Sequence, residues 1–149
     1  MRVFNRKFKR EYEPLEKFEA GIVLTGPEVK SMKAGRCKLE GAYVKLVDEG
    51  VLLVNAEVAP YAFARQEGYD PKRSRKLLLN KREIRRLAGK LSAGGNLTIV
   101  PIACYNRRGK VKVEIALAKG RKTWQKRKVE KNRAEKRRVE KEIKEALKR

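Results

Sequence analysis

Short segments in which apolar and polar residues alternate recur along most of the chain, and this period of two is typical of half-buried β-strands. Residues 42–48 alternate in this way, and a hairpin turn at Glu49-Gly50 leads from them into the apolar run 51–54. Residues 20–24 form another short apolar run, which suits a buried strand. The pattern therefore predicts a mainly β protein.

The longest predicted hairpin covers residues 97–118. Its first strand, 97–105, is the most apolar stretch and contains Pro101, which predicts an edge or a bulge because proline cannot donate a ladder hydrogen bond. A turn at 106–109 leads into the return strand, and the alternation of that strand puts Lys112 on the face away from the core.

Two segments carry helical signals instead. In the first, Thr25 is followed three residues later by Glu28, with Pro27 in the first turn, and together they predict a capping box at the start of a helix over residues 26–34. Gly35 ends this helix, because glycine readily adopts the left-handed conformation found after helix C-termini.

The second helix begins after Asn80, which is followed by Glu83 in the same capping pattern, and it ends at Gly94-Gly95. Apolar residues recur in it at helical spacing and are expected to face the core. They are Ile84, Leu87, Ala88 and Leu91.

These elements predict the fold class of residues 1–118 as mainly β, a small antiparallel OB-like β-barrel flanked by two or three helices. Residues 119–149 form a basic C-terminal tail that holds 15 Lys and Arg against 5 Glu. The tail has too few apolar residues to build a core, so we expect it to be disordered or a fluctuating helix in the free protein. Good helix formers and i,i+4 pairs such as Glu140–Lys144 favour the helix once the tail is bound.

The formal net charge of +22 gives information about the binding partner. A charge excess of this size repels itself in a compact fold and is relieved when a polyanion binds. The composition therefore indicates nucleic-acid binding, the alternative being a protein with a solvated basic face. No segment has an apolar face wide enough for an interfacial helix, and no apolar run has the length of a signal or a membrane span, so we expect a cytoplasmic protein with no membrane partner.

Catalytic chemistry has little support in the composition. The chain has no histidine, and Cys37 and Cys104 lack the spacing of a zinc site and are expected to be small buried hydrophobes. We therefore expect no cofactor, no metal, no small-molecule substrate and no enzymatic activity. Scattered glutamates leave an RNA-processing enzyme as a remote alternative. A structural ribosomal protein with a basic rRNA-binding tail is the nearer alternative.

Aromatic residues stand beside basic ones at several places, and this combination can hold RNA because bases stack on rings while cations hold phosphates. One such place is the irregular segment 59–76, whose basic cluster consists of Lys72, Arg73, Arg75 and Lys76. Aromatic residues of the body are interpreted first as packing, whereas Trp124 has no apolar neighbours in the tail, which favours stacking on a base. Spacing alone predicts only internal ion pairing for the acidic residues around Glu19.

Several strings of residues occur together in one order along the chain. They are Asn5-Arg6-Lys7 followed by Tyr12, Phe18-Glu19-Ala20-Gly21-Ile22, Gly26-Pro27-Glu28-Val29-Lys30-Ser31, Ala34-Gly35, Pro60-Tyr61, Arg75-Lys76-Leu77-Leu78-Leu79, Val100-Pro101 and Ala118-Lys119-Gly120-Arg121-Lys122. In this combination, which runs over residues 5–127, the chain resembles the SsrA-binding protein (SmpB) family.

The resemblance implies an OB-like barrel that binds the tRNA-like elbow of transfer-messenger RNA (SsrA RNA) and helps to load it onto ribosomes stalled without a stop codon. This process, trans-translation, rescues the ribosome and tags the unfinished peptide. The resemblance also implies that the tail enters the decoding centre and the empty mRNA channel of the small subunit, contacts its rRNA and becomes helical there. The implied partners are thus transfer-messenger RNA and the ribosome, and we expect the free protein to be a monomer.

The resemblance also assigns residues. Glu19, Leu78 and Lys112 match family RNA-binding positions, which makes a functional role the preferred interpretation of Glu19. With the matching surface segments and the basic cluster, the predicted RNA-binding set of the body is Asn5, Tyr12, Glu19, Lys30, Arg73, Arg75, Lys76, Leu78 and Lys112. The predicted ribosome-binding set of the tail is Lys119, Arg121, Lys122, Trp124, Lys126 and Arg127.

The tail departs from the family pattern, which commonly reads Gly-Lys-Lys, two residues, then Asp-Lys-Arg. Here the corresponding residues 120–127 read Gly-Arg-Lys-Thr-Trp-Gln-Lys-Arg. Trp124 falls at a position that is often aromatic or histidine in the family. Gln125 replaces the acid, which calls into question any role that needs a negative charge there but leaves the basic pair that follows intact.

Overall fold

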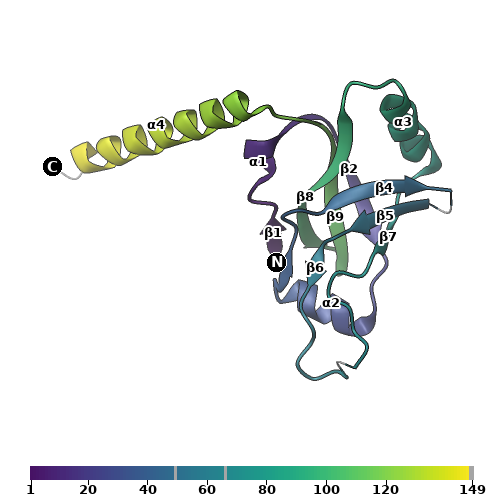
Figure 1. Ribbon diagram of the computed structural model, residues 1–149. Coiled ribbons are helices and arrows are strands. Elements are labelled where there is room, and N and C mark those ends of the chain that lie inside the picture. The colour runs from purple at the N-terminus through teal and green to yellow at the C-terminus, as the bar shows by residue number, and fades with distance from the viewer. Residues whose placement is uncertain (49, 66, 148–149) are drawn as a thin grey trace.

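The computed structural model describes residues 1–48, 50–65 and 67–147, and it describes Thr123 and Trp124 by their backbone alone. Figure 1 shows a twisted β body with a long helix projecting from it. In chain order the elements are β1 (Arg2–Phe4), α1 (Phe8–Glu11), β2 (Tyr12–Ile22), α2 (Gly26–Lys33), β3 (Cys37–Lys38), β4 (Tyr43–Val47), β5 (Gly50–Val54), β6 (Glu57–Val58), β7 (Arg75–Leu78), α3 (Lys81–Ser92), β8 (Leu97–Arg107), β9 (Lys110–Gly120) and α4 (Thr123–Leu147).

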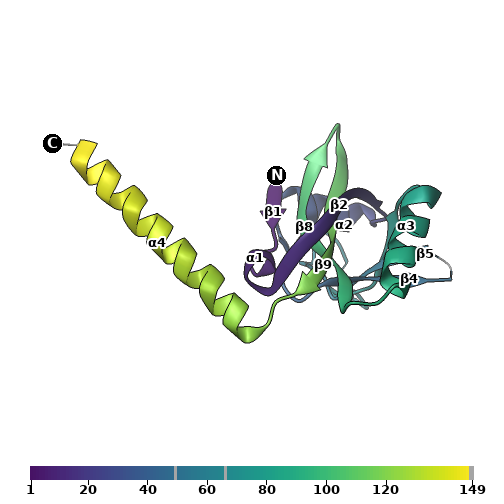
Figure 2. The same cartoon turned by 90° about the horizontal axis from the view of Figure 1, so that it is seen from above.

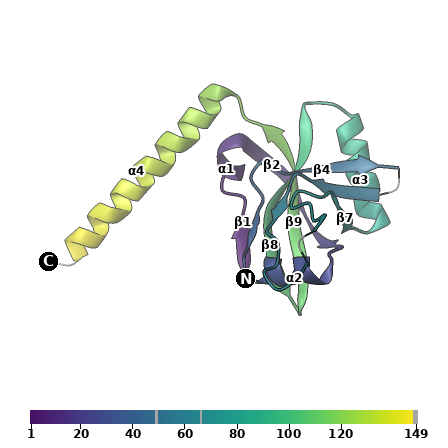
Figure 3. The ribbon, with the colours of Figure 1, turned by 60° about the horizontal axis from the view of Figure 1, so that its bottom comes forward.

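Seven strands form one antiparallel sheet in the order β1-β8-β4-β5-β7-β2-β9, and β8 pairs in addition with β9. This last pairing closes six of the strands into a ring, with β1 added beside β8. The short strands β3 and β6 pair separately. Helices α1, α2 and α3 lie around the outside of the strands (Figure 3). The predicted mainly β fold with flanking helices is confirmed, and the ring is compatible with an OB-like barrel.

The main core takes every second residue from the strands, as the alternation predicts. On β9 these residues are Val111, Val113, Ile115 and Leu117. Cys37 and Cys104 are buried in the same core as free thiols, with their Sγ atoms 3.3 Å apart. Their interpretation as small buried residues is therefore confirmed.

A second, smaller core covers the opposite face of the β8–β9 hairpin. Its buried members are Phe8, Val100, Ala116 and Ala118, and Tyr12 packs against them. The chain therefore buries both faces of this hairpin near α1, which explains why its sequence is so apolar.

The helix signals are local and are confirmed. Glu28 Oε1 accepts the backbone N–H of Thr25 at 3.0 Å, and Thr25 Oγ1 accepts the N–H of Glu28 at 3.4 Å, so the capping box is complete. Gly35 follows α2 with φ +76°. In α3 Leu87 is fully buried, but Ala88 is exposed, contrary to prediction, because it lies on the flank of the narrow apolar stripe.

Two of the strand predictions need adjustment and one is confirmed. β2 begins at Tyr12, well before the predicted 20–24, because its outer half alternates only weakly yet pairs with β9 along its length. The predicted bulge at Pro101 is confirmed by a register shift between Pro101 and Ala103. The hairpin turn narrows to Arg108 and Gly109, which have φ +53° and +78°, as a two-residue type I′ turn requires.

Of the other predicted turn, Glu49 lies outside the described residues, and Gly50 already pairs with Val47 as the first residue of β5.

The tail leaves the body as one long helix. β9 continues through Gly120, two residues beyond the predicted boundary, and α4 follows from Thr123 to Leu147. Figure 2 shows α4 pointing away from the sheet, with its first turns near α1. Beyond Val129 every described residue of α4 is exposed. Beyond its first turns the helix therefore rests mainly on the helix propensity of its residues.

Candidate nucleic-acid interface

The strand register gathers residues of five strands into one row on the outer face of the sheet. Gly21 of β2 lies opposite both Leu78 of β7 and Lys112 of β9. Lys112 in turn lies opposite Tyr105 of β8, and Tyr105 opposite Arg2 of β1. Directly opposed residues in antiparallel strands point to the same side of a sheet. We call these residues, together with Glu19, the sheet-face row.

Gly21 sets the spacing of this row. A Cβ atom at this position would lie 3.3 Å from Cβ of Leu78 and 3.7 Å from Nζ of Lys112. The first distance is tighter than ordinary van der Waals contact, so a larger residue at position 21 would push Leu78 aside by a few tenths of an ångström. Leu78 remains 53% exposed. An exposed leucine next to a lysine is a mixed apolar and cationic contact surface.

Glu19 stands two residues before Gly21 and is held in place by two neighbours. Nη1 of Arg107 donates to both carboxylate oxygens, at 3.1 and 3.0 Å, and the Tyr105 hydroxyl donates to Oε2. The hydrogen bond from Tyr105 and those from Arg107 lower the pKa of Glu19. Burial and the neighbouring Glu19 raise the pKa of Tyr105 to about 12. Glu19 therefore offers an ionised, oriented acceptor at neutral pH.

Cations near the row differ in how far they are already neutralised. Glu114 pairs with Arg2 at 3.8 Å and with Lys17 at 4.0 Å. Within the described part of the chain, Lys112 and Lys76 take part in no ion pair. Lys76 is exposed on the same side of β7 as Leu78. These two ammonium groups are thus available to a bound anion.

Arg75 is placed in the core and not on the surface. Its side chain is fully buried and donates from Nε to Oε2 of Glu28 at 2.6 Å. Its remaining donors reach the Tyr69 hydroxyl and backbone carbonyls, including those of Ala56 at 2.9 Å and Pro71 at 3.1 Å. We therefore correct the prediction of an RNA contact: Arg75 is a structural residue, which sequence reasoning missed because its buried partner Glu28 is 47 residues away.

The same buried cluster explains Glu28. Burial alone would raise the pKa of its carboxyl, but hydrogen bonds from the Thr25 N–H, Arg73 and Arg75 outweigh burial and lower that pKa to about 2. Arg73 reaches Oε1 of Glu28 while its own side chain is 42% exposed. Arg73 therefore combines a structural ion pair with a surface position.

Asn5 is also structural. Only 7% of the residue is exposed; its Nδ2 donates to the carbonyl of Pro101 at 3.0 Å and its Oδ1 accepts the N–H of Lys7 at 3.2 Å. A β-bulge leaves backbone groups unpaired, and the Asn5 side chain satisfies one of them, the carbonyl of Pro101. The backbone N–H of Asn5 donates in addition to the carbonyl of Ile102. Asn5 thus has a structural role here, and its RNA contact stays a prediction.

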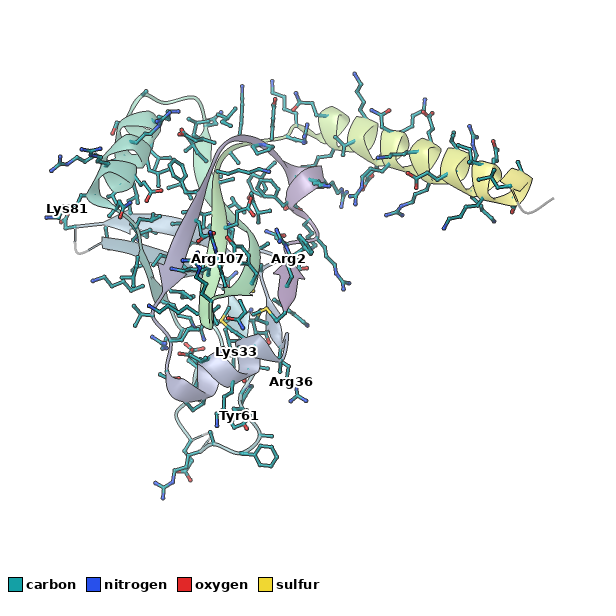
Figure 4. All side chains as sticks on the ribbon, turned by 180° about the vertical axis from the view of Figure 1, so that it is seen from behind. Arg2, Lys33, Arg36, Tyr61, Lys81 and Arg107 are labelled. Carbon is teal, nitrogen blue, oxygen red and sulfur yellow. The ribbon has the colours of Figure 1, made fainter. Side chains whose placement is uncertain are left out.

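The other predicted body residues fall into three places. Glu19, Lys76, Leu78 and Lys112 come together on the sheet face. Lys30 is exposed on α2, at the same end of the molecule as the loop that carries Arg73, and Figure 4 labels Lys33, Arg36 and Tyr61 there. Tyr12 is half-buried, with its ring stacked on Phe8 at 5.9 Å between centroids.

Tyr12 lines a groove of about 860 Å³ between the start of β2 and α4. The groove walls mix rings and cations, among them Phe4, Arg121, Arg133 and Arg137. Arg121 Nε donates to the carbonyls of Lys9 and Tyr12, each at 3.2 Å, and an ion pair of 2.6 Å joins Arg10 to Glu130. The base of α4 is thereby attached to α1.

The predicted tail residues are divided between strand and helix. Lys119 is the exposed penultimate residue of β9, Arg127 is exposed on α4, and Lys126 is half-buried. Gln125 Oε1 accepts the N–H of Lys122 at 2.9 Å and so caps the start of α4 without a negative charge. The side chain of Trp124 lies outside the part that the structure describes.

Sequence reasoning missed Tyr105, Arg107 and Arg2 on the sheet face. Tyr105 could have been found from the sequence, because the turn at 108–109 fixes the pairing of β8 with β9 and puts Tyr105 opposite Lys112. Arg2 had no such signal, since β1 is only three residues long and pairs with a strand about a hundred residues later.

Over the described ranges, no group of three or more His, Cys, Asp or Glu residues is arranged to hold a metal ion. None of the helices described is both long enough and apolar enough to cross a membrane.

Comparison with known proteins identifies relatives over nearly the full length. An SsrA-binding protein of Sulfurihydrogenibium sp. is 49% identical over 144 residues, which cover 97% of this chain and 94% of that protein. An SsrA-binding protein of Thermus thermophilus is 45% identical over 131 residues, covering 87% and 90%. A chain in the solved structure described as "tmRNA-SmpB: a journey to the center of the bacterial ribosome" is 44% identical with a TM-score of 0.67, covering 82% and 85%.

The family described as SmpB protein matches residues 2–145, a range that takes in the sheet-face row, the buried Glu28 cluster and nearly all of α4. This match and the identities above agree with the resemblance carried by the sequence strings. The chain belongs to the SmpB family.

Proposed function

We propose that this chain binds the tRNA-like region of transfer-messenger RNA through its sheet face and delivers that RNA to stalled ribosomes in trans-translation. The observation that carries the proposal is the row centred on Gly21, where Leu78, Lys112 and the oriented Glu19 meet on one exposed surface. The relatives are named for SsrA binding, and the solved relative comes from a tmRNA-SmpB study of the ribosome.

Three members of the row and the neighbouring Lys76 supply different kinds of contact in such a complex. Lys112 and Lys76 neutralise phosphates, which supplies affinity without reading sequence. Leu78 covers an apolar face of a base or ribose. Glu19, ionised and held by Arg107, accepts a hydrogen bond from a base edge or a ribose 2′-OH, a group that distinguishes RNA from DNA.

The body and the tail divide the work. Residues 1–120, through the end of β9, hold the RNA, and the residues that follow enter the decoding centre and the empty mRNA channel of the small subunit, where the rRNA phosphates neutralise their charge. The chain acts by binding and without catalysis, in the cytoplasm where ribosomes work. A channel filled with mRNA leaves no room for the tail, so only a stalled ribosome with an empty channel accepts the complex.

Deleting residues 123–149 tests this division because the shortened chain ends at Lys122, just after β9, and keeps every element of the body. We expect the shortened chain to bind a transcript of the tRNA-like region as the full chain does, and to support no peptide tagging in a reconstituted translation system stalled on mRNA without a stop codon. Loss of RNA binding would contradict the division. Constant stoichiometry of the protein on all ribosomes would instead favour a structural ribosomal protein.

A further inference from the structure

We propose that the tip of the loop between β6 and β7 is a second RNA contact, in which Phe63 stacks on an unpaired base. The inference rests on the proposed function and adds a contact outside the sheet-face row. In Figure 4 Tyr61, which shares the tip with Phe63, lies beyond α2, while Arg107 and Arg2 of the sheet face lie near the middle of the molecule.

Phe63 is the most exposed large apolar side chain in the described chain, at 87%. Its ring meets the edge of Tyr61, with centroids 5.5 Å apart and planes inclined by 65°. The ammonium group of Lys30 lies 5.3 Å from the Tyr61 centroid. Tyr61 is thus held between a ring and a cation, and it steadies Phe63 while leaving the Phe63 ring exposed to solvent.

The loop has fixed ends and a projecting tip. At the base, the N–H of Val58 donates to the Pro71 carbonyl at 2.9 Å, and the N–H of Ala59 donates to the Arg36 carbonyl at 3.0 Å. The Tyr69 hydroxyl donates to the Val58 carbonyl at 2.9 Å and accepts from the buried Arg75. The ends of the loop are therefore fixed while its tip projects. This limits the conformational entropy that the loop loses when a nucleobase binds to the tip.

Charge around the tip favours a nucleic acid as the occupant. Exposed cations from α2, its C-terminal end and the loop outnumber the exposed acids Glu67 and Asp70; these cations are Lys30, Lys33, Arg36, Arg65 and Lys72. A cavity of about 320 Å³ lies between the loop and the start of α2, lined by Pro27, Tyr61, Arg65 and Tyr69 among others. Rings interleaved with cations bind single-stranded RNA by stacking on bases and neutralising phosphates.

The test uses the full chain and a labelled transcript of the tRNA-like region, at fixed salt. Replacing Phe63 by Leu keeps an apolar side chain but removes the aromatic ring, whereas Phe63→Tyr keeps the ring. We expect Phe63→Leu to weaken RNA binding by about 5- to 100-fold and Phe63→Tyr to bind like the unaltered chain. Chemical probing should show one unpaired base that is protected by the unaltered chain and reactive with Phe63→Leu.

Leu15→Ala serves as the matched control, because Leu15 is also an exposed large apolar residue, at 54%, but lies on β2. Equal affinity and equal base protection for Phe63→Leu and the unaltered chain would overturn the loop contact. If Lys112→Ala still weakens RNA binding in that case, the proposed function stands without the loop contact. If the unaltered chain itself ignores the transcript, the proposed function fails. A Phe63→Leu effect seen only on binding to ribosomes without transfer-messenger RNA would also overturn the proposal, in favour of a ribosomal contact.

Discussion

The sheet face and the tail helix carry the same kind of charge but hold it in opposite ways. On the sheet face, Lys112 and Leu78 are fixed by cross-strand register around Gly21, and Glu19 is held by two partners. Along α4, nearly every described side chain is exposed, and the first turns contact the body. The sheet face is held by contacts between strands, whereas the described residues of α4 beyond its first turns make no contacts with the body that hold them. The difference teaches that a high net charge alone does not define a binding site.

The largest expected effect tests whether the body depends on its buried ion cluster. Replacing Arg75 by Ala leaves Glu28 buried without its main partner, and we expect a loss of about 3–5 kcal/mol in the free energy of unfolding. Urea denaturation measures this loss. The matched variant Arg73→Ala removes a cation that is 42% exposed and is expected to cost about 1 kcal/mol or less. Equal effects of the two variants would contradict the burial argument.

The next test separates the tail from the body. Ala134 is exposed in the middle of α4, and Ala134→Pro removes a helix hydrogen bond and introduces a clash, at a local cost of about 3 kcal/mol. We expect circular dichroism to show less helix, with the urea midpoint of the body and the affinity for the tRNA-like RNA unchanged. A shift in that midpoint would show that α4 stabilises the body. Ala134→Gly should reproduce the helix loss at about 1 kcal/mol.

The smallest expected effect measures a single contact of the sheet face. Lys112→Ala should weaken RNA binding and reduce the slope of log affinity against log salt by about 1, the signature of one lost phosphate contact. Titrations at several salt concentrations give that slope. Lys81→Ala is the control, since Lys81 is exposed at the start of α3, away from the sheet face (Figure 4). A lower affinity with an unchanged slope would mean that Lys112 acts without contacting phosphate.

Features that depend on neighbours in the sequence could be predicted. Thr25 and Glu28 form their capping box. This follows from the backbone geometry of a few adjacent residues.

Features that depend on distant partners could not be predicted from spacing. Arg75 looked like one of a row of loop cations, and only the fold brings it onto Glu28. Asn5 likewise serves a bulge that is 96 residues away. The family resemblance assigned Glu19, Leu78 and Lys112 to RNA-binding positions, but only the cross-strand pairs bring them together on one surface.

Gly21 has a consequence for how this surface can change over time. Positions at the periphery of a protein usually accept many residue types, because a new side chain can extend into solvent. Position 21 has less freedom, since a Cβ atom there would stand 3.3 Å from the Leu78 Cβ and would require Leu78 to shift by a few tenths of an ångström. A substitution there is thus coupled to the placement of Leu78, although the position lies at the surface. A lineage that lost this glycine would have to accommodate a small shift of Leu78, while Lys112 already lies at an ordinary contact distance.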